Sequence, residues 1–410
     1  MDNNEYRVYL YGIRGIYNYG CEAMIRSISK CLVNRISNCK VIYKTYDYDN
    51  DQKSLCDCDT VELETVNRVK RPLFFRALRY FKRKLRIASP QDYLSIDLAW
   101  TQNCDLLVII GGDVFDLAWN QRTEKIYDND RIFVSKIVKK AGGKVALWGI
   151  SVGDFDCNLS AKAKLVDYFN NTVDVGIIRD EKSIKYLENN GVSKCVLYSD
   201  PAFIQKSLQT EQKQKTILGI NLSPLSNKYL HEKKNYEEWV SLWANRICEL
   251  NAHLKYDEIY LIPHVVNSNM PNDDDFSYLK DIYSILEERK LNAKLLSGDL
   301  GFLTIKPYLC ECDLILAARM HCAVNAITCG VPTIFLSYSS KSLGMCRHVY
   351  GNDRMVVDMN EILKGTYNFD ELCEISKNTC ELREYLKQRN VELYDDAIKA
   401  TDVLVQMINK

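Results

Sequence analysis

The stretch from Asp313 to Lys341 decides the fold, and it reads DLILAARMHCAVNAITCGVPTIFLSYSSK. An apolar run of strand length precedes a segment of helical length, and a second apolar run follows it. Gly330 and Pro332 are typical of a helix that ends just before them. A strand, a helix and a second strand in this order predict one unit of a parallel α/β sheet.

The same alternation of apolar runs and helical segments fills both halves of the chain. In the first half we expect strands at 7–13, 40–43, 106–110, 145–148 and 173–178, and helices at 22–36, 131–141, 161–170 and 181–190. In the second half we expect strands at 217–222, 259–262, 293–296, 314–317 and 333–336, and helices at 237–250, 278–289, 322–329 and 378–408. The predicted fold class is therefore α/β, with two Rossmann-like doubly wound domains that face a cleft.

A polar segment without periodicity, at 205–216, separates the two halves. We expect an N-terminal domain at 1–204, a linker at 205–216, a C-terminal domain at 217–377 and a closing helix at 378–410 that packs back across the domains. Ligands of such sheets bind outside the carboxyl ends of the strands. The loops that follow strands are therefore the first places to search for a site.

Length and composition are those of a globular protein with two domains. The 410 residues exceed one ordinary core, and a formal net charge of +0 gives no general attraction for nucleic acid. The chain shows no secretory signal and no apolar run of membrane-spanning length. Its 16 cysteines mostly stand singly, and the pairs Cys56/Cys58 and Cys310/Cys312 lack the usual spacing of zinc ligands. We expect a cytoplasmic protein that holds no metal.

Two glycine-rich loops follow predicted strands of the first half. One contains Asn18 and Gly20 directly before a helix, and the other contains Gly112 and Asp113. Glycine lets a backbone approach a ligand, and a helix N-terminus offers N–H groups to an anion. These four residues are candidates for an acceptor or donor loop, although a tight turn without a ligand explains the same glycines. The first loop lacks the GxGxxG pattern of dinucleotide sites.

Arg179 stands at the carboxyl end of the predicted strand at 173–178. Its guanidinium fork fits a carboxylate or a phosphate of a ligand. It fits a structural pair with a neighbouring acid such as Asp200 equally well. The sequence leaves both alternatives open for this arginine.

Two of the five histidines follow predicted strands of the second half. His264 comes after the strand at 259–262, and His321 stands two residues after Arg319 at the start of a predicted helix. A buried histidine is often only a core residue, but an arginine, an imidazole and a helix N-terminus together suit an anion. Lys341, after the next strand, adds a flexible cation to the same edge. We therefore predict an anionic small-molecule donor here, and His264 is a further candidate for an acceptor or donor loop.

A basic amphipathic helix is predicted at 68–87. Between Thr65 and Gln91 there is no acidic residue, and the basic residues are Arg68, Lys70, Arg71, Arg76, Arg79, Lys82, Arg83, Lys84 and Arg86. The apolar positions, among them Phe74 and Phe81, fall on one face at helical spacing. Such a helix fits peripheral contact with the inner face of an anionic membrane, and it also fits a solvated helix packed on its domain.

Several motifs, taken in chain order, resemble the polysaccharide pyruvyl transferase family. They are Asn18-x-Gly20-x-Glu22-Ala23, Gly111-Gly112-Asp113, Arg179-Asp180-x-x-Ser183, Ser199-Asp200-Pro201-Ala202-Phe203, Gly219-Ile220-Asn221, Arg319-x-His321, Gly330-Val331-Pro332 and Tyr338-x-x-Lys341. The resemblance covers roughly residues 7 to 345. One departure is Cys21, which stands where many members carry an aspartate.

The resemblance implies a fold similar to the B-type glycosyltransferases, with phosphoenolpyruvate as donor substrate and no cofactor. The enolpyruvyl group would move to two hydroxyls of a glycan sugar, forming a pyruvate ketal and releasing phosphate, in the biosynthesis of a cell-surface polysaccharide such as capsule or exopolysaccharide. By position, Arg319 and Arg179 correspond to donor-binding residues and His321 to the catalytic acid, with Lys341 as a further cation. The N-terminal domain would hold the acceptor, and a lipid-linked glycan follows if the basic helix touches a membrane.

Two alternatives remain open. A nucleotide-sugar-dependent glycosyltransferase of the same architecture commonly places an acid on the ribose, yet no acidic residue stands between His321 and Asp353. A non-catalytic binding protein of this fold is favoured by Cys21 but opposed by the presence of Arg319, His321 and Lys341.

Overall fold

The computed structural model describes residues 5–69, 74, 77–78, 80–81, 96–112, 114–117, 129–205, 215–338 and 341–410, without the side chain of Lys341. The chain divides into two compact units. The N-terminal unit comprises Met1–Ile16, Met24–Pro201 and Asp396–Lys410, and the C-terminal unit comprises Tyr17–Ala23 and Ala202–Asp395. The predicted domains at 1–204 and 217–377 missed this exchange of segments, because Tyr17–Ala23 belongs to the C-terminal unit.

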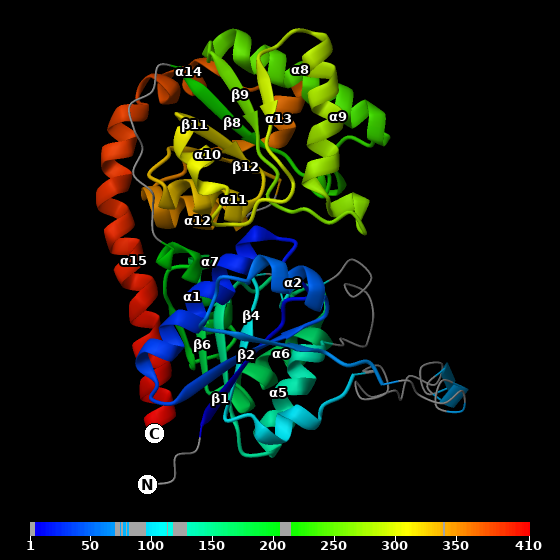
Figure 1. The fold of residues 1–410 in the computed structure, drawn as a ribbon, viewed down its shortest axis with the longest axis vertical. Helices are drawn as coiled ribbons and strands as arrows, with labels where there is room; N and C mark the ends of the chain where they lie inside the picture. Colours follow the sequence, from blue (N-terminus) through cyan, green and yellow to red (C-terminus); the bar gives the residue numbers. More distant parts are fainter. Residues whose placement is uncertain are drawn as a thin grey trace. The chain divides into compact units, whose positions relative to one another are not determined.

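Within the described residues, seven parallel strands form the sheet of the N-terminal unit, in the order β3-β2-β1-β4-β5-β6-β7 (Figure 1). The strands are β1 (Tyr6–Tyr11), β2 (Cys39–Thr45), β3 (Glu62–Thr65), β4 (Leu106–Ile110), β5 (Lys144–Ile150), β6 (Val175–Ile178) and β7 (Cys195–Leu197). The helices are α1 (Tyr19–Arg35), α2 (Tyr48–Ser54), α5 (Asp130–Lys140), α6 (Leu159–Asn171) and α7 (Glu181–Asn189).

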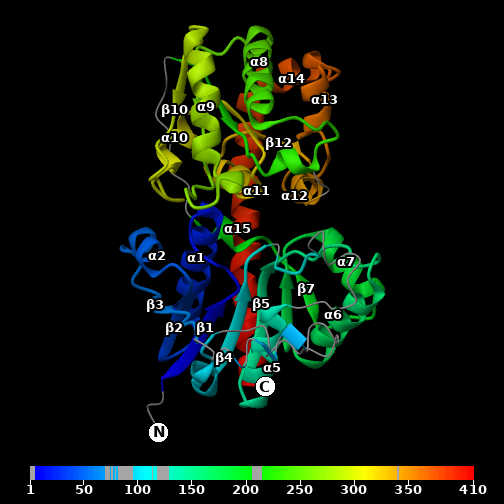
Figure 2. The ribbon, with the colours of Figure 1, turned by 90° about the vertical axis from the view of Figure 1, so that its right-hand side faces the viewer.

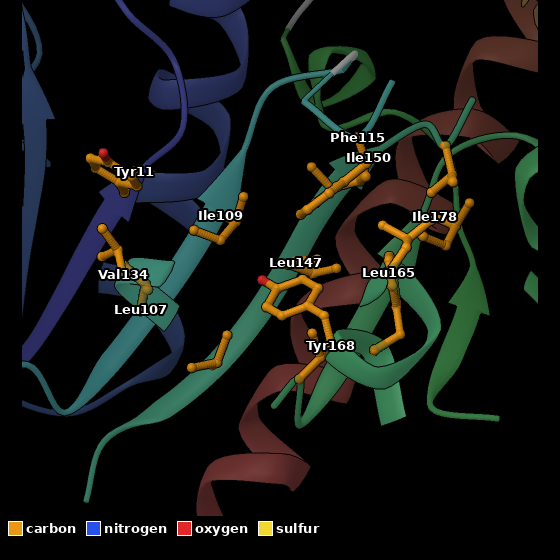
Figure 3. Packing of buried hydrophobic residues seen from close by; sticks show 14 of the residues in the cluster. Tyr11, Leu107, Ile109, Phe115, Val134, Leu147, Ile150, Leu165, Tyr168 and Ile178 are labelled. Atoms are coloured by element: carbon orange, nitrogen blue, oxygen red, sulfur yellow. The ribbon is translucent and has the colours of Figure 1, made fainter. Parts of the chain in front are cut away.

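Both faces of the central strands in this sheet are buried. On one face, side chains of β1, β4 and β5 pack against α5, α6 and α7 in a cluster of aromatic and branched residues. Figure 3 shows Leu107 and Leu147 from the sheet together with Val134 and Tyr168 from the helices. The alternate residues of the same strands, such as Val108, are equally buried. Strands that are apolar on both faces are typical of a parallel sheet covered by crossover helices.

Within the described residues, six parallel strands form the sheet of the C-terminal unit, in the order β10-β9-β8-β11-β12-β13. The strands are β8 (Ile217–Asn221), β9 (Glu258–Leu261), β10 (Ala293–Leu295), β11 (Leu314–Ala317), β12 (Thr333–Ser337) and β13 (Val356–Asp358). The helices are α8 (Tyr236–Leu254), α9 (Asp275–Glu288), α10 (Lys306–Glu311), α11 (Met320–Thr328), α12 (Lys341–Tyr350), α13 (Met359–Lys364), α14 (Phe369–Lys377) and α15 (Thr379–Asn409). Figure 2 shows α8 and α9 side by side in this unit.

Both sheets reverse their strand order at one place. In the N-terminal unit the reversal lies between β1 and β4, and in the C-terminal unit it lies between β8 and β11. Doubly wound folds bind ligands outside the carboxyl ends of the strands at such a switch point. The loops after β8 and β11 are therefore the first candidates for a site in the C-terminal unit.

The long helix α15 contributes residues to both units, with the change at Asp395 and Asp396. In the C-terminal unit, Nη2 of Arg389 donates to the carbonyl oxygen of His348 at 2.6 Å. In the N-terminal unit, Nζ of Lys144 donates to the carbonyl oxygens of Met407 and Ile408 at 2.8 and 2.7 Å. These carbonyls belong to the last turn of the helix, whose carbonyl groups have no partners within the helix itself.

Most of the predicted basic helix at 68–87 lies outside the described residues. Among the positions that are described, Phe74 and Phe81 are exposed, at 72% and 60%. No helix in the described part of the chain combines the length and the apolar composition that a bilayer crossing requires. Contact of this segment with a membrane surface stays a prediction.

Candidate functional site

The candidate site lies at the switch point of the C-terminal sheet. Asn221, the last residue of β8, stands opposite Ala317, the last residue of β11. Its buried amide group accepts a hydrogen bond at Oδ1 from the backbone N–H of Arg319 at 2.8 Å. Its Nδ2 donates to the carbonyl oxygen of Ile262, just beyond β9, also at 2.8 Å. Asn221 therefore joins the ends of three neighbouring strands and fixes the chain where α11 begins.

Helix α11 starts directly after this junction and confirms the helix predicted at 322–329. Arg319 occupies the residue before the first turn with an extended backbone, and no side chain caps the helix. His321 is the second helical residue. The helix ends at Cys329, where Gly330 has a φ of +72° that glycine adopts without strain. Arg319 and His321 therefore stand at the positive end of the helix dipole.

Two aspartates hold the guanidinium of Arg319. Its Nε and Nη2 donate to Oδ1 of Asp275 at 3.0 and 2.8 Å, and Nη2 also donates to Oδ1 of Asp273 at 2.6 Å. Burial acts to lower the pKa of Arg319, but the two carboxylates outweigh burial and raise it. Within the described residues, Nη1 makes no hydrogen bond. The two carboxylates offset the positive charge of the guanidinium. Arg319 therefore offers a ligand oriented N–H donors rather than a net positive charge.

Asp275 connects Arg319 to the loop that contains His264. The carboxylate is fully buried, and its Oδ2 accepts hydrogen bonds from the backbone N–H groups of His264 and Val265 at 3.2 and 3.0 Å. Burial raises the pKa of Asp275, and the guanidinium of Arg319 opposes that rise. The side chain of Asp273 is 22% exposed and contacts Arg319 through one oxygen. Asp275 is therefore the structural partner of Arg319, and Asp273 the more replaceable one.

The imidazole of His321 lies against the first turn of α1. A Cβ atom on Gly20 would stand 2.2 Å from Cγ of His321 and 2.3 Å from Nδ1. Side chains do not tolerate such approaches, so the ring keeps its place only when residue 20 is glycine. His321 and Arg319 are 8% and 9% exposed, so neither residue is sealed from solvent.

The segment Tyr17–Ala23 brings Gly20 to this place. The backbone N–H of Tyr19 donates to the carbonyl oxygen of His264 at 3.1 Å, and Asn18 pairs with the next residue of that loop as an antiparallel bridge. Oδ1 of Asn18 accepts from the N–H of Gly20 at 2.9 Å, which satisfies one donor of the first helical turn. The structure thus brings Asn18, Gly20 and His264 together with Arg319 and His321 in one unit.

His264 is fully buried close to His321. Its Nε2 lies 3.5 Å from Nδ2 of Asn325, and its Nδ1 has no hydrogen-bond partner among the described residues. The ring centres of His264 and Tyr19 are 5.3 Å apart. Burial lowers the pKa of His264 well below its usual value, and the charges of His321 and Arg319 lower it further. His264 is therefore neutral at pH 7.

Arg179 and Gly112 lie together in the N-terminal unit. Nη1 of Arg179 donates to Oδ2 of Asp200 at 2.8 Å, and Nε donates to Oγ of Ser151 at 2.8 Å. A Cβ atom on Gly112 would stand 2.0 Å from Nη2 of Arg179. The structural pair with Asp200, one of the two alternatives drawn from the sequence, is present. Donor binding by Arg179 stays a prediction.

The structure does not describe the side chains of two site residues that were predicted from the sequence. Asp113 is not among the described residues, and the side chain of Lys341 is not described, although its backbone begins α12. Within the described residues, no group of three or more His, Cys, Asp or Glu side chains could hold a metal ion. The roles of Asp113 and Lys341 stay predictions.

Sequence reasoning missed the acids of this site. Asp273 and Asp275 belong to the run Asn272-Asp-Asp-Asp275, which ends at the first residue of α9, and acids at a helix start are ordinarily explained by the helix dipole. Glu22 was part of a quoted motif without a role, and its Oε2 accepts from the N–H of Phe302 at 2.7 Å. A signal was available for the aspartates, because their loop ends at the same sheet edge as the loop after β11.

The model of one protein family, described as polysaccharide pyruvyl transferase, matches residues 18–340. The chain belongs to the polysaccharide pyruvyl transferase family. The resemblance predicted from the motifs is therefore confirmed, and the matched range contains Asn18, Gly20, Arg179, Arg319 and His321. Membership of the pyruvyl transferase family makes the protein a transferase of polysaccharide biosynthesis, with a glycan as the class of acceptor. No curated protein sequence matches the chain.

Solved structures share the fold of this pyruvyl transferase family member at low sequence identity. A glycosyltransferase from Rickettsia africae is 11% identical with a TM-score of 0.57, and 99% of each chain is covered. UDP-GlcNAc 2-epimerase from Neisseria meningitidis is 10% identical with a TM-score of 0.56, and 98% of each chain is covered. A putative UDP-N-acetylglucosamine 2-epimerase from Listeria monocytogenes is 9% identical with a TM-score of 0.55, covering 94% of this chain and 91% of that one. The predicted similarity to B-type glycosyltransferases is thus confirmed for the fold.

Proposed function

We propose that this protein transfers the enolpyruvyl group of phosphoenolpyruvate to two hydroxyls of a glycan sugar, with His321 as the acid. The observation that carries the proposal is the junction of β11 and α11. There a fixed guanidinium, an imidazole and the positive end of a helix occur within three consecutive residues. Family membership supplies the class of reaction, and this junction suits the anionic donor of that class.

The two anionic groups of phosphoenolpyruvate need different partners. A carboxylate fits the remaining N–H edge of the Arg319 guanidinium, because Asp275 holds the guanidinium and Asn221 holds the backbone of the same residue. A phosphate fits the N–H groups in the first turn of α11, which no side chain caps. Because Asp273 and Asp275 offset the charge of Arg319, further cations are needed. We assign this role to Lys341, which belongs to the same unit as Arg319.

Of the two neighbouring histidines, His321 is the better proton donor. The depressed pKa of His264 leaves that ring neutral at pH 7, so it has no proton to give there. His321 is 8% exposed, whereas His264 is fully buried. We therefore assign to His264, together with Gly20, the task of keeping the imidazole of His321 in place.

The reaction balances without a further reactant. His321 gives a proton to the methylene carbon of phosphoenolpyruvate, and cationic character develops at C2. One acceptor hydroxyl attacks C2 and loses its proton, which restores the acid. The second hydroxyl then displaces phosphate and loses its proton to the leaving group. The products are a pyruvate ketal of the glycan and inorganic phosphate.

Phosphate release from phosphoenolpyruvate in the presence of a panel of glycan acceptors tests the proposal. We expect release with at least one acceptor, and loss of turnover by at least about a hundredfold in His321→Ala because a general acid contributes on that order. His231→Ala is the matched control, since His231 is exposed and lies outside the site. Full activity of the His321 variant, or no release with any acceptor, would count against the proposal.

The fold alone does not choose between phosphoenolpyruvate and a nucleotide sugar as donor. Thermal unfolding in the presence of each compound separates the two, because a ligand that binds the folded chain raises its Tm. We expect phosphoenolpyruvate to raise the Tm and UDP-sugars to leave it unchanged. The opposite result would favour a glycosyltransferase. Stabilisation by phosphoenolpyruvate without turnover on any acceptor would favour a binding protein.

A further inference from the structure

Lys306 is a buried lysine in α10 that forms no salt bridge with any of the described residues. It is 2% exposed, and its Nζ donates to Oγ1 of Thr328 at 2.6 Å and to Sγ of Cys329 at 3.8 Å. Its other contact is the ring of Phe302, with Nζ 5.1 Å from the ring centre. None of these partners within the described residues is an acid. A buried ammonium without an anion is unfavourable, so the thiol of Cys329 is the group placed to supply negative charge.

Cys329 is placed to ionise more readily than an ordinary buried thiol. Cys310 stands one turn after Lys306 in α10, and its thiol forms a hydrogen bond with that of Cys329 at the end of α11. The bond from Cys310 lowers the pKa of Cys329, burial opposes it, and the charge of Lys306 lowers it further, to about 7. The two thiols and the ammonium therefore form one contact between α10 and α11.

A second buried thiol of the same unit, that of Cys346, ionises less readily than an ordinary thiol. Cys346 in α12 is fully buried, and its Sγ donates to the carbonyl oxygen of Asn352 at 3.3 Å. Burial raises the pKa of Cys346 to about 12. The contrast with Cys329 follows from the partners of each sulfur, and it provides an internal reference for reactivity.

We propose that Lys306, Cys310 and Cys329 form an oxidation site at which a peroxide converts the two thiols into a disulfide. The thiolate sulfur of Cys329 attacks one oxygen of hydrogen peroxide, and the O–O bond breaks to give a sulfenic acid and hydroxide. The sulfur of Cys310 then attacks the sulfur of Cys329, the S–O bond breaks, and a second hydroxide leaves. The protons of the two thiols convert both hydroxides to water, and two electrons pass from sulfur to the peroxide.

The resulting bond would link α10 to Cys329, the residue that directly follows α11. The first turn of the same helix carries His321, so oxidation acts on the element that presents the candidate site. Cys329 is 6% exposed, so the residue stands close to solvent and to a small oxidant. The inference does not depend on the donor or the acceptor of the enzyme.

The test is peroxide treatment of the full chain at pH 7.5, followed by blocking of free thiols and peptide mapping under non-reducing conditions. Digestion after Glu311 separates Cys310 from Cys312, so the linked peptide identifies the partner of Cys329. We expect a Cys310–Cys329 link that forms at least about tenfold faster than any oxidation of Cys346, and that thiol reductants reverse. No link, or equal reaction of Cys346, overturns the proposal.

Variants show whether the neighbours activate Cys329. In Cys310→Ser we expect a sulfenic acid at Cys329 that dimedone traps, because no second thiol resolves it. In Lys306→Met we expect slower oxidation, and Cys346→Ser should leave the link unchanged as the matched control. Dimedone labelling that does not reach Cys329 in Cys310→Ser refutes the mechanism, even if the Lys306 variant fails to fold.

Discussion

Gly20 controls the position of His321 by having no side chain. In an unhindered helix, glycine to alanine stabilises by about 1 kcal/mol. At this position the added Cβ would stand 2.2 Å from the imidazole, so we expect the ring to move. We predict that Gly20→Ala lowers kcat for phosphate release by at least about tenfold while the chain stays folded. Steady-state kinetics with phosphoenolpyruvate, together with circular dichroism, measure both effects.

Gly142→Ala is the control for this substitution. Gly142 has a φ of +95°, and a Cβ atom added there would have no heavy atom within 4 Å, so alanine adds backbone strain without a clash. We expect a loss of about 1 kcal/mol in stability and unchanged kcat. Equal kcat in the two glycine variants would show that the contact with His321 has no bearing on turnover.

Because two aspartates contact Arg319, one negative charge can be removed while the other aspartate still holds the guanidinium. Asp273→Asn removes one of two negative charges beside the guanidinium, and about 1 kcal/mol of repulsion toward an anionic donor disappears with it. We predict a KM for phosphoenolpyruvate that falls on the order of fivefold. Asp281→Asn is the matched control, because it changes the net charge equally at an exposed position. An equal fall in KM for the control would assign the effect to overall charge.

The depressed pKa of His264 predicts a loss of stability in acid. Below about pH 6.5 the unfolded chain binds a proton at His264 that the folded chain does not bind. The free energy of unfolding therefore falls by about 1.4 kcal/mol per pH unit as the pH drops, until the folded pKa is reached. Denaturant unfolding at pH 6.5 and 5.5 should show this excess loss in the native protein and not in His264→Gln. Equal losses in both proteins would contradict the prediction.

Arg319 and His321 could be predicted from the sequence, but the residues that hold their side chains in place could not. Arg319 and His321 were predictable because they follow an apolar strand and precede a helix, which fixes where both side chains begin. Asp275 was not, since its pairing with Arg319 depends on a loop path 44 residues away in sequence. The contact of Gly20 with His321 was not predictable either. The two residues are far apart in sequence, and a glycine in a turn has many explanations.

At the scale of elements, burial decided which strands were predictable. The strands predicted at 106–110 and 314–317 coincide with β4 and β11, which lie inside their sheets and are buried at every residue. The strands β3, β7 and β13 were missed. They are three or four residues long and lie at sheet edges, where half-exposed residues give no apolar run.

The predicted helix at 68–87 is the element that bears on the acceptor. Nine basic residues and the exposed rings of Phe74 and Phe81 suit an anionic bilayer, and a lipid-linked glycan would then be the natural acceptor. We predict that the protein sediments with phosphatidylserine vesicles at low salt and is released at high salt. Phe74→Ser with Phe81→Ser should weaken binding, whereas Tyr229→Ser, at another exposed ring, should not. Failure of the native protein to sediment would refute membrane contact.

At the scale of the whole molecule, the two doubly wound sheets could be predicted. Which segments of the chain belong to which unit could not. Alternating strands and helices are a local property of the sequence, so the fold class followed from periodicity. Tyr17–Ala23 joins the C-terminal unit through hydrogen bonds to the loops after β9 and β10. Backbone groups, the carboxylate of Glu22 and the hydroxyl of Tyr19 make these bonds, and no local pattern of residue types reveals them.

The segment Tyr17–Ala23 packs against residues that are translated much later, so its contacts cannot form early in synthesis. This segment is synthesised before its partners His264, Phe302 and His321, which emerge more than two hundred residues later. A nascent or truncated chain therefore carries the glycine without the imidazole it will touch. Only a chain translated past His321 can assemble the contact, so prematurely released fragments carry no finished site.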